Sequence, residues 1–164
     1  MTLIAVAVMA ACGASGPSSA NNHGAGSSSS SGAGAVSVPK GQPMKASNGE
    51  TVSITGFMAN YPNGNGTLAP GDQCIKVTFS INNGSSGDWG YPQSELTVLD
   101  VSGKSHPIGA SGATCPGSAG PVILAAGHRD DTMGLTFEVP SSGALTLKWS
   151  PALLQGQTYE TPLQ

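Results

Sequence analysis

Apolar and polar residues alternate with a period of two along four segments of this chain. In residues 75–82 every odd position is apolar and every even position is polar, and similar alternation recurs in residues 51–58, 132–139 and 145–150. An alternation of this kind places one face of a β-strand against a core and the other face in water. Each of these segments therefore predicts a half-buried strand.

Two shorter apolar runs, residues 96–99 and 121–124, predict strands that are buried more fully. The intervening segments are rich in Gly, Asn, Asp, Ser and Pro, the residues that dominate turns. No window shows a helical stripe of apolar residues. Six or seven short strands joined by turns predict an all-β domain, an antiparallel β-sandwich of about seven strands over residues 46–164.

Four stretches carry a resemblance to a known family: residues 74–84, 96–104, 124–140 and 145–149. They resemble the central strand, the next hairpin, the most characteristic stretch and the closing strand of a telokin-like, immunoglobulin-fold family of unknown function. That family is common in secreted bacterial lipoproteins. Ala126 departs from the proline that usually precedes the glycine there. The resemblance implies an immunoglobulin-like fold and an extracytoplasmic location, and the family shares no catalytic or cofactor residues.

The first twelve residues carry a second motif. Residues 2–11 are almost wholly apolar and small, and Cys12 and Gly13 follow directly. This order resembles the lipobox of bacterial lipoproteins, in which the cysteine is diacylated and the preceding peptide is removed. Residues 1–12 therefore predict a lipoprotein signal peptide that ends at Cys12. The resemblance implies an extracytoplasmic protein anchored to the bacterial cell membrane through lipid on Cys12.

Other interpretations of this segment fit less well. A transmembrane helix needs about 20 apolar residues, and the run at 2–11 is half as long. An ordinary secretory signal carries a basic region before its apolar run, and no Lys or Arg stands there. A disordered apolar N-terminus on a cytosolic protein remains the third alternative. The Gly/Ser-rich stretch that follows favours the lipoprotein instead, because a spacer is the expected neighbour of an anchored cysteine.

Gly, Ala and Ser dominate residues 13–45, including five consecutive serines at 27–31. A segment of this composition cannot bury enough apolar surface to offset the entropy lost on ordering. We therefore expect a disordered linker, which as a flexible chain would span about 30 Å root-mean-square. Its role would be to hold the folded domain away from the membrane.

The three cysteines fall into two groups, one in the N-terminal motif and two in the predicted domain. Cys12 belongs to the lipobox, which leaves Cys74 and Cys115 as the pair within the predicted domain. In an oxidising compartment such a pair predicts a disulfide, which would stabilise the domain by about 4 kcal/mol in the chain-entropy model. Two separate reduced cysteines are the alternative. A zinc site is disfavoured, because no CxxC spacing or His pair accompanies them.

Composition excludes one class of partner. Charged residues make up 9% of the chain, the net charge is −3, and Arg129 is the single arginine. Because phosphate backbones are bound by clustered Lys and Arg, we expect no binding to nucleic acid. The five lysines are scattered, so attraction to anionic lipid is also weak. Attachment to the membrane would depend on the acyl chains.

Histidines and charged residues give two candidates for a site. Residues 128–131, His-Arg-Asp-Asp, form the densest charged cluster, between a turn at Gly127 and a strand expected to begin at Thr132. Metal or carboxylate binding is conceivable there, but charged residues in such a place usually solvate a loop. His106 has no acidic residue beside it in the sequence, so we expect it to lie on the surface.

Catalytic patterns are otherwise missing from the sequence. No G-x-S-x-G motif places a serine on a strand-to-helix turn, and the nine acidic residues form no obvious pair for glycoside hydrolysis. Methionines could suggest a copper carrier, but Met58 and Met133 fall on the apolar side of their strands, where core filling is expected. We therefore predict a protein that is not an enzyme, without a cofactor or a metal site.

Trp89 and Tyr91, in the Gly/Pro-rich stretch 87–92, point most directly to a function. Exposed aromatic residues in a loop at the end of a sandwich suit recognition of an envelope protein or a glycan. Alternatively, both rings pack onto the open end of the sandwich. The sequence thus predicts a lipid-anchored, non-catalytic binding module. A carrier of a metal or small ligand is the alternative, and a hydrolase is less favoured; both would need a pocket with converging polar groups.

Overall fold

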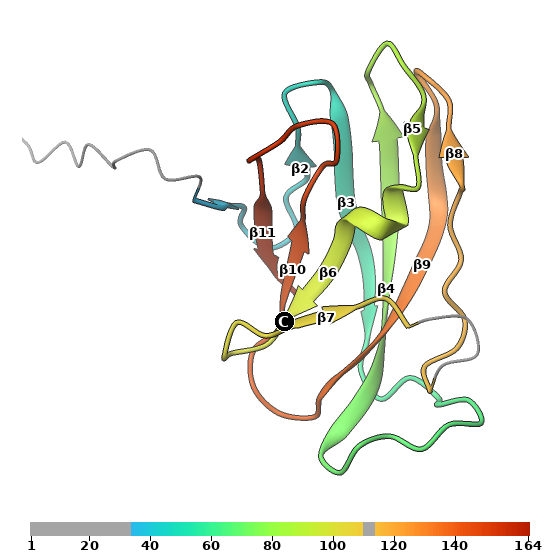
Figure 1. The fold of residues 1–164 in the computed structure, drawn as a ribbon, viewed down its shortest axis with the longest axis vertical. Helices are drawn as coiled ribbons and strands as arrows, with labels where there is room; N and C mark the ends of the chain where they lie inside the picture. Colours follow the sequence, from blue (N-terminus) through green and yellow to red (C-terminus); the bar gives the residue numbers. More distant parts are fainter. Residues whose placement is uncertain (1–33, 110–113) are drawn as a thin grey trace, which may run out of the picture. The chain divides into compact units, whose positions relative to one another are not determined.

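The computed structural model describes residues 34–109 and 114–164. Within these residues the chain forms eleven β-strands and one short 3-10 turn, η1 (Pro92–Glu95), and it contains no α-helix. The strands form two main sheets and a separate two-stranded ribbon (Figure 1). The predicted all-β sandwich is confirmed, although the described residues hold more strands than the predicted seven because several are only two residues long.

One main sheet is fully antiparallel and has the order β2-β3-β4-β9. Its two longest members are β4 (Asp72–Asn83) and β9 (Arg129–Pro140), which pair along most of their length. β3 (Glu50–Met58) pairs with β4 on one side, and the two-residue strand β2 (Met44–Lys45) pairs with the start of β3 on the other.

The second sheet has the order β1-β11-β10-β6-β7. Its strands are shorter: β1 (Val36–Ser37), β6 (Leu96–Leu99), β7 (Ser105–Pro107), β10 (Thr146–Trp149) and β11 (Tyr159–Pro162). All pairs are antiparallel except β1 with β11, which is parallel. The ribbon consists of β5 (Trp89–Gly90) and β8 (Ile123–Leu124), which lie beside β9 in Figure 1.

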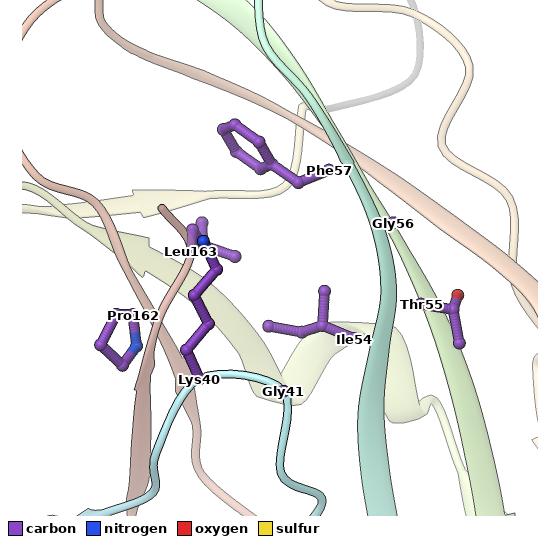
Figure 2. A pocket seen from close by; sticks show the side chains of 8 residues that line it. All are labelled: Lys40, Gly41, Ile54, Thr55, Gly56, Phe57, Pro162 and Leu163. Carbon is purple, nitrogen blue, oxygen red and sulfur yellow. The ribbon is translucent and has the colours of Figure 1, made fainter.

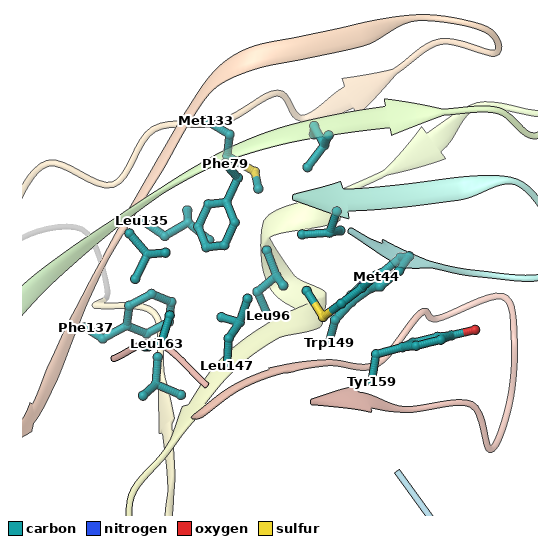
Figure 3. Packing of buried hydrophobic residues seen from close by; sticks show 14 of the residues in the cluster. Met44, Phe79, Leu96, Met133, Leu135, Phe137, Leu147, Trp149, Tyr159 and Leu163 are labelled. Carbon is teal, nitrogen blue, oxygen red and sulfur yellow. The ribbon is translucent and has the colours of Figure 1, made fainter. Parts of the chain in front are cut away.

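The core lies between the two main sheets. The odd-numbered apolar residues of β4 and β9, among them Phe79 and Phe137, are fully buried, as the alternation predicts. They belong to one cluster with Leu96, Leu147 and Trp149 of the opposite sheet (Figure 3). This interleaving of large side chains from two facing sheets is what makes the fold a sandwich.

A β-bulge corrects the prediction for Met58. The register between β3 and β4 shifts between Ile54 and Gly56, so Thr55 is an extra residue. Because side chains alternate between the faces of a strand, a shift of one residue exchanges the faces beyond it. Phe57 therefore packs against the core, and Met58 is 55% exposed. Met133, in contrast, is buried as expected.

The sandwich begins before residue 46. Val36 and Ser37 pair with β11, and Met44 and Lys45 pair with β3, so part of the predicted linker at 13–45 belongs to the sheets. Strands of two residues are too short to show an alternation in the sequence. The predicted signal peptide at 1–12 and linker residues 13–33 lie outside the described residues.

Candidate functional site

The predicted disulfide between Cys74 and Cys115 is present, with the two Cα atoms 5.4 Å apart. It attaches the segment that precedes β8 to β4. The hydroxyl of Thr136 donates a hydrogen bond of 2.7 Å to the carbonyl oxygen of Cys115, and Ala119 forms a β-bridge to Gly134. The segment around Cys115 is therefore fixed against β9, and it leads directly to β8.

Trp89 does not lie on the surface. Its side chain is 1% exposed, with its ring centroid 5.8 Å from that of Trp149. Trp149 in turn stacks on Tyr159 at 5.2 Å, so three aromatic rings form a continuous row inside the sandwich. Of the two interpretations of Trp89, contact with a partner and packing onto the sandwich, the structure supports the second, because the ring fills the core.

Tyr91 has the opposite environment. It is 60% exposed, and its backbone adopts the left-handed conformation, with φ 51° and ψ 48°. Few residues other than glycine, asparagine and aspartate adopt this conformation, because the Cβ atom approaches the backbone too closely. The backbone is held in place by hydrogen bonds at both ends: its N–H donates to the carbonyl oxygen of Val122 at 2.7 Å, and its carbonyl accepts from the Ser94 hydroxyl at 2.8 Å.

Two exposed aliphatic residues belong to the segment whose backbone accepts the hydrogen bond from Tyr91. Val122 and Ile123 are 55% and 60% exposed, although the sequence predicted a strand that is buried more fully. Ile123 pairs with Gly90, which has no side chain to cover it. We call Tyr91, Val122 and Ile123 the ribbon patch. Sequence reasoning missed the two aliphatic residues, because the apolar run at 121–124 contains no signal that distinguishes an exposed ribbon from a core strand.

Asn83 supports the ribbon patch from inside the domain. It is fully buried at the end of β4, and its side-chain amide donates hydrogen bonds of 2.8 Å to the carbonyl oxygens of Gly87 and Leu124. Its carbonyl Oδ1 accepts from the N–H and the hydroxyl of Ser85. All of its hydrogen-bonding groups are thus used to hold the 83–89 loop and β8 together.

His106 is buried, and the prediction of a surface residue is wrong. Its Nε2 lies 2.9 Å from Oδ2 of Asp100 across the β6–β7 hairpin. Because a carboxylate accepts hydrogen bonds, Nε2 carries the proton and donates it. Asp100 also accepts from the Ser102 hydroxyl at 2.6 Å. The hydrogen bond from His106, followed by that from Ser102, holds the pKa of Asp100 well below its usual range.

The charged cluster at 128–131 begins β9 rather than a loop, since the strand begins at Arg129 instead of Thr132. Nε of Arg129 donates to Asp131 at 2.7 Å, and Asp130 accepts from the N–H and the hydroxyl of Thr132. Hydrogen bonds from Ser80 and then from Arg129 hold the pKa of Asp131 below its usual range. Both aspartates thus accept hydrogen bonds from neighbouring side chains.

Two glutamates are buried at one end of the sandwich. Glu95 accepts hydrogen bonds from Nε1 of Trp149 at 2.9 Å and from the N–H of Ala152 at 3.1 Å. Glu50 begins β3, and its Oε1 has no hydrogen-bond partner among the described residues. Burial raises the pKa of Glu50, and the charge of Glu95 raises it further, while a hydrogen bond with Asn48 lowers it.

The predicted chemical groups are not brought together in the described part of the chain. Residues 34–109 and 114–164 contain no group of three or more His, Cys, Asp or Glu side chains arranged to hold a metal ion. No helix formed by these residues is long and apolar enough to cross a membrane. The ribbon patch is therefore the candidate functional surface among the residues that the sequence singled out.

Three solved structures share this architecture. The Bacillus subtilis protein ycdA, provisionally described as a lipoprotein, matches with a TM-score of 0.59 at 13% identity, over 73% of this chain and 38% of its own. The secreted Mycobacterium tuberculosis protein MPT63 matches with a TM-score of 0.57 at 12% identity, over 79% and 99%. The yjhA protein of Bacillus subtilis matches with a TM-score of 0.57 at 15% identity, over 77% and 98%.

These likenesses establish the fold of the chain as that of bacterial β-sandwich proteins, which include a secreted protein. No family model matches the chain, and no curated protein matches it in sequence. Membership of the telokin-like family therefore stays a prediction. The disulfide between Cys74 and Cys115 indicates an oxidising, extracytoplasmic location.

Proposed function

We propose that this protein is a lipid-anchored, non-catalytic binding module of the bacterial cell envelope, and that the ribbon patch contacts a protein partner. The observation that carries the proposal is the conformation of Tyr91. A bulky residue held at φ 51° and 60% exposed costs stability without contributing to the core. Asparagine, which stands at Asn60, the other non-glycine residue with a positive φ in the described part of the chain, would fit there with less strain. A tyrosine at position 91 therefore supports a role for its exposed ring in contact with another molecule.

The composition of the ribbon patch favours a protein partner over a glycan. Besides the tyrosine, the patch consists of two exposed aliphatic residues, Val122 and Ile123, and aliphatic groups offer no hydrogen bonds to sugar hydroxyls. Tyrosine is enriched among the residues that dominate binding at protein interfaces, especially where apolar neighbours exclude water around it. The ribbon is also fixed by Asn83 and by the disulfide-linked segment, so binding would require little ordering of the backbone.

Site-specific photo-crosslinking in living cells tests the partner. A photoreactive residue placed at Val122 or at Ile123 is compared with one at Val101 or Leu153, which are exposed hydrophobic positions outside the patch. We expect one envelope protein to be captured from the patch positions and not from the control positions. The captured protein is then purified, and its dissociation constant for this chain should increase at least tenfold when Ile123 is replaced by Ser.

Three results would overturn the partner proposal. Capture of the same protein from Val101 would show that the contact is not specific to the patch. A glycan, or a second copy of this chain, as the crosslinked species would contradict a heterologous protein partner. An unchanged dissociation constant for Ile123→Ser would show that the patch contributes nothing to binding.

The anchor is tested separately by mass spectrometry of the protein extracted from membranes. We expect the mature chain to begin at Cys12, to carry acyl groups and to be two hydrogens lighter than its reduced form because of Cys74–Cys115. Replacing Cys12 by Ala should release the protein from the membrane fraction. A chain that keeps Met1 and has no acyl group would contradict the anchor and leave the partner proposal intact.

A further inference from the structure

A groove opens between the two main sheets, on the side away from β9. It lies between β3 and the end of β11, with a volume of about 380 Å³. The groove exists because β2 pairs only with Thr51 and Val52, so the rest of β3 has no strand on that side. Ligand sites in proteins commonly have volumes of about 300–1,000 Å³, and this groove falls at the small end of that range.

Apolar side chains from both sheets form the walls. Ile54 and Phe57 project from β3, and Pro162 and Leu163 lie across from them at the end of β11 (Figure 2). The bulge at Thr55 is what brings Phe57 to this side of the strand. Ile54 and Phe57 also pack against the core, so the walls are supported from behind. Such a surface favours an apolar ligand over water.

One cation stands at the groove. Lys40 occupies a turn in which the N–H of Gln42 donates to the carbonyl oxygen of Pro39 at 3.1 Å, and Figure 2 shows its side chain extending from that turn towards Leu163. No Asp or Glu lines the groove. Within residues 34–109 and 114–164 the side-chain contacts at ion-pair distance are His106–Asp100 and Arg129–Asp131, so Lys40 has no carboxylate partner there.

We propose that this groove binds a free amphiphile with a carboxylate head and an unbranched apolar chain, the carboxylate at Lys40 and the chain between Ile54, Phe57 and Leu163. The charge of the groove carries the inference, because its lining residues include the ammonium group of Lys40 and no Asp or Glu. One ammonium group offers up to three donors to a single anionic head. Lysine also binds phosphate, and a comparison with phosphatidylglycerol vesicles separates that head group from the carboxylate.

Binding is measured with decanoate, at concentrations too low for micelles to form. The protein is the full chain carrying Cys12→Ser, so that no acyl group is attached. Amide chemical shifts locate the site, and calorimetric titration gives the dissociation constant. Decanol and decyltrimethylammonium, which share the chain and differ in the head, are titrated in parallel. We expect decanoate to bind most tightly and to shift the amide signals of Ile54, Phe57 and Leu163.

Variants separate the head from the chain. Lys40→Ala should weaken decanoate binding by roughly fivefold and leave decanol binding unchanged. Lys40→Glu should reverse the preference, so that decyltrimethylammonium binds better than decanoate. Lys45→Glu is the matched control, because Lys45 is exposed on β2 and does not line the groove. Ile54→Ser should weaken the binding of all three probes. Because Ile54 is half-buried, the test also uses Lys40→Glu, which changes an exposed residue. An unchanged pattern of amide chemical shifts shows that Lys40→Glu is folded.

Several results would overturn the proposal. Decanoate could fail to bind, or it could shift signals only at the ribbon patch. Equal affinity for decyltrimethylammonium, or an effect of Lys45→Glu as large as that of Lys40→Glu, would remove the role of Lys40. Binding to phosphatidylglycerol vesicles that depends on Lys40, without binding of decanoate, would assign the groove to a membrane surface instead of a free amphiphile. Apart from shifts at the ribbon patch, these results do not bear on the partner of that patch.

Discussion

The side-chain amide of Asn83 donates a hydrogen bond of 2.8 Å to the backbone carbonyl of Leu124. This contact joins the end of β4 to β8, two segments that are 41 residues apart in the chain. Leu124 is buried, and its neighbours Val122 and Ile123 are exposed. The hydrogen bond therefore helps to fix the position of the ribbon patch relative to the sandwich, although Asn83 itself is buried.

Replacing Asn83 by Ala should destabilise the domain. The buried carbonyl group of Leu124 would lose its partner, and an unsatisfied buried acceptor costs roughly 1–3 kcal/mol. Gly87 is exposed, and its carbonyl group keeps its hydrogen bond from the Ser85 hydroxyl. Urea denaturation measures the loss, and hydrogen exchange should be faster at the ribbon. Asn82→Ala is the matched control, since the neighbouring side chain lines the outer face of the sheet. Equal stability of the two variants would contradict the role of Asn83.

Replacing Tyr91 by Asn should separate stability from binding. Asparagine tolerates the left-handed conformation better than tyrosine, and the exposed ring makes few internal contacts. We expect the free energy of unfolding to stay constant or to rise by up to about 1 kcal/mol, while crosslinking of the partner from Val122 is lost. Trp89→Ala, in contrast, should lower the free energy of unfolding by about 3–5 kcal/mol, because it leaves a cavity in the core. A Tyr91→Asn variant that unfolds would refute the strain argument.

Replacing Glu50 by Gln should stabilise the domain near neutral pH. Burial raises the pKa of Glu50 above its ordinary value of 4.5. A group whose pKa is raised by folding contributes its full stabilisation when the pH lies below its pKa in the unfolded chain. That stabilisation is lost as the pH rises through its pKa in the folded chain. The variant should therefore gain on the order of 1 kcal/mol near neutral pH, and the gain should disappear below the ordinary pKa. Urea denaturation across this pH range, with Glu160→Gln as control, gives the comparison.

Asp100 should produce the opposite pH dependence. Its pKa is lowered, first by the hydrogen bond from His106 and then by that from Ser102. A lowered pKa contributes stability above the unfolded-state value of 3.8 that is lost as the pH falls. Asp100→Asn should therefore be less stable than the natural chain near neutral pH and lose less stability on acidification. Asp72→Asn, which removes a carboxylate outside the hairpin, is the control. If Asp100→Asn and Asp72→Asn lose the same stability on acidification, His106 and Asp100 are not coupled.

Reducing the Cys74–Cys115 disulfide should lower the free energy of unfolding by about 4 kcal/mol, because the unfolded chain regains the entropy of the closed loop. The same loss is expected for the double variant Cys74→Ala with Cys115→Ala. Cys12→Ala should have no effect on unfolding, since Cys12 is not part of this bond. Denaturation with and without a reducing agent measures the difference, and identical curves would leave the disulfide without a stabilising role.

Part of the fold could be predicted because its signal is local. The alternation in residues 75–82 and 132–139 located β4 and β9, since the period of two is a property of each strand alone. The pairing of Cys74 with Cys115 followed from a count of cysteines. Short strands gave no such signal: β1 exists because Val36 and Ser37 meet β11, more than a hundred residues later in the chain.

The candidate sites depended on tertiary structure. Trp89 and Tyr91 are two residues apart in similar surroundings of the sequence, yet one ring fills the core and the other is exposed. The same holds for Phe57 and Met58, whose environments were exchanged by a bulge at Thr55. His106 and Asp100 form a hydrogen bond across a hairpin. The all-β class, the long strands and the disulfide follow from the amino-acid sequence, because composition and periodicity are local. Only the folded chain decided which side chains reach the surface, because burial depends on the segments that pack against them.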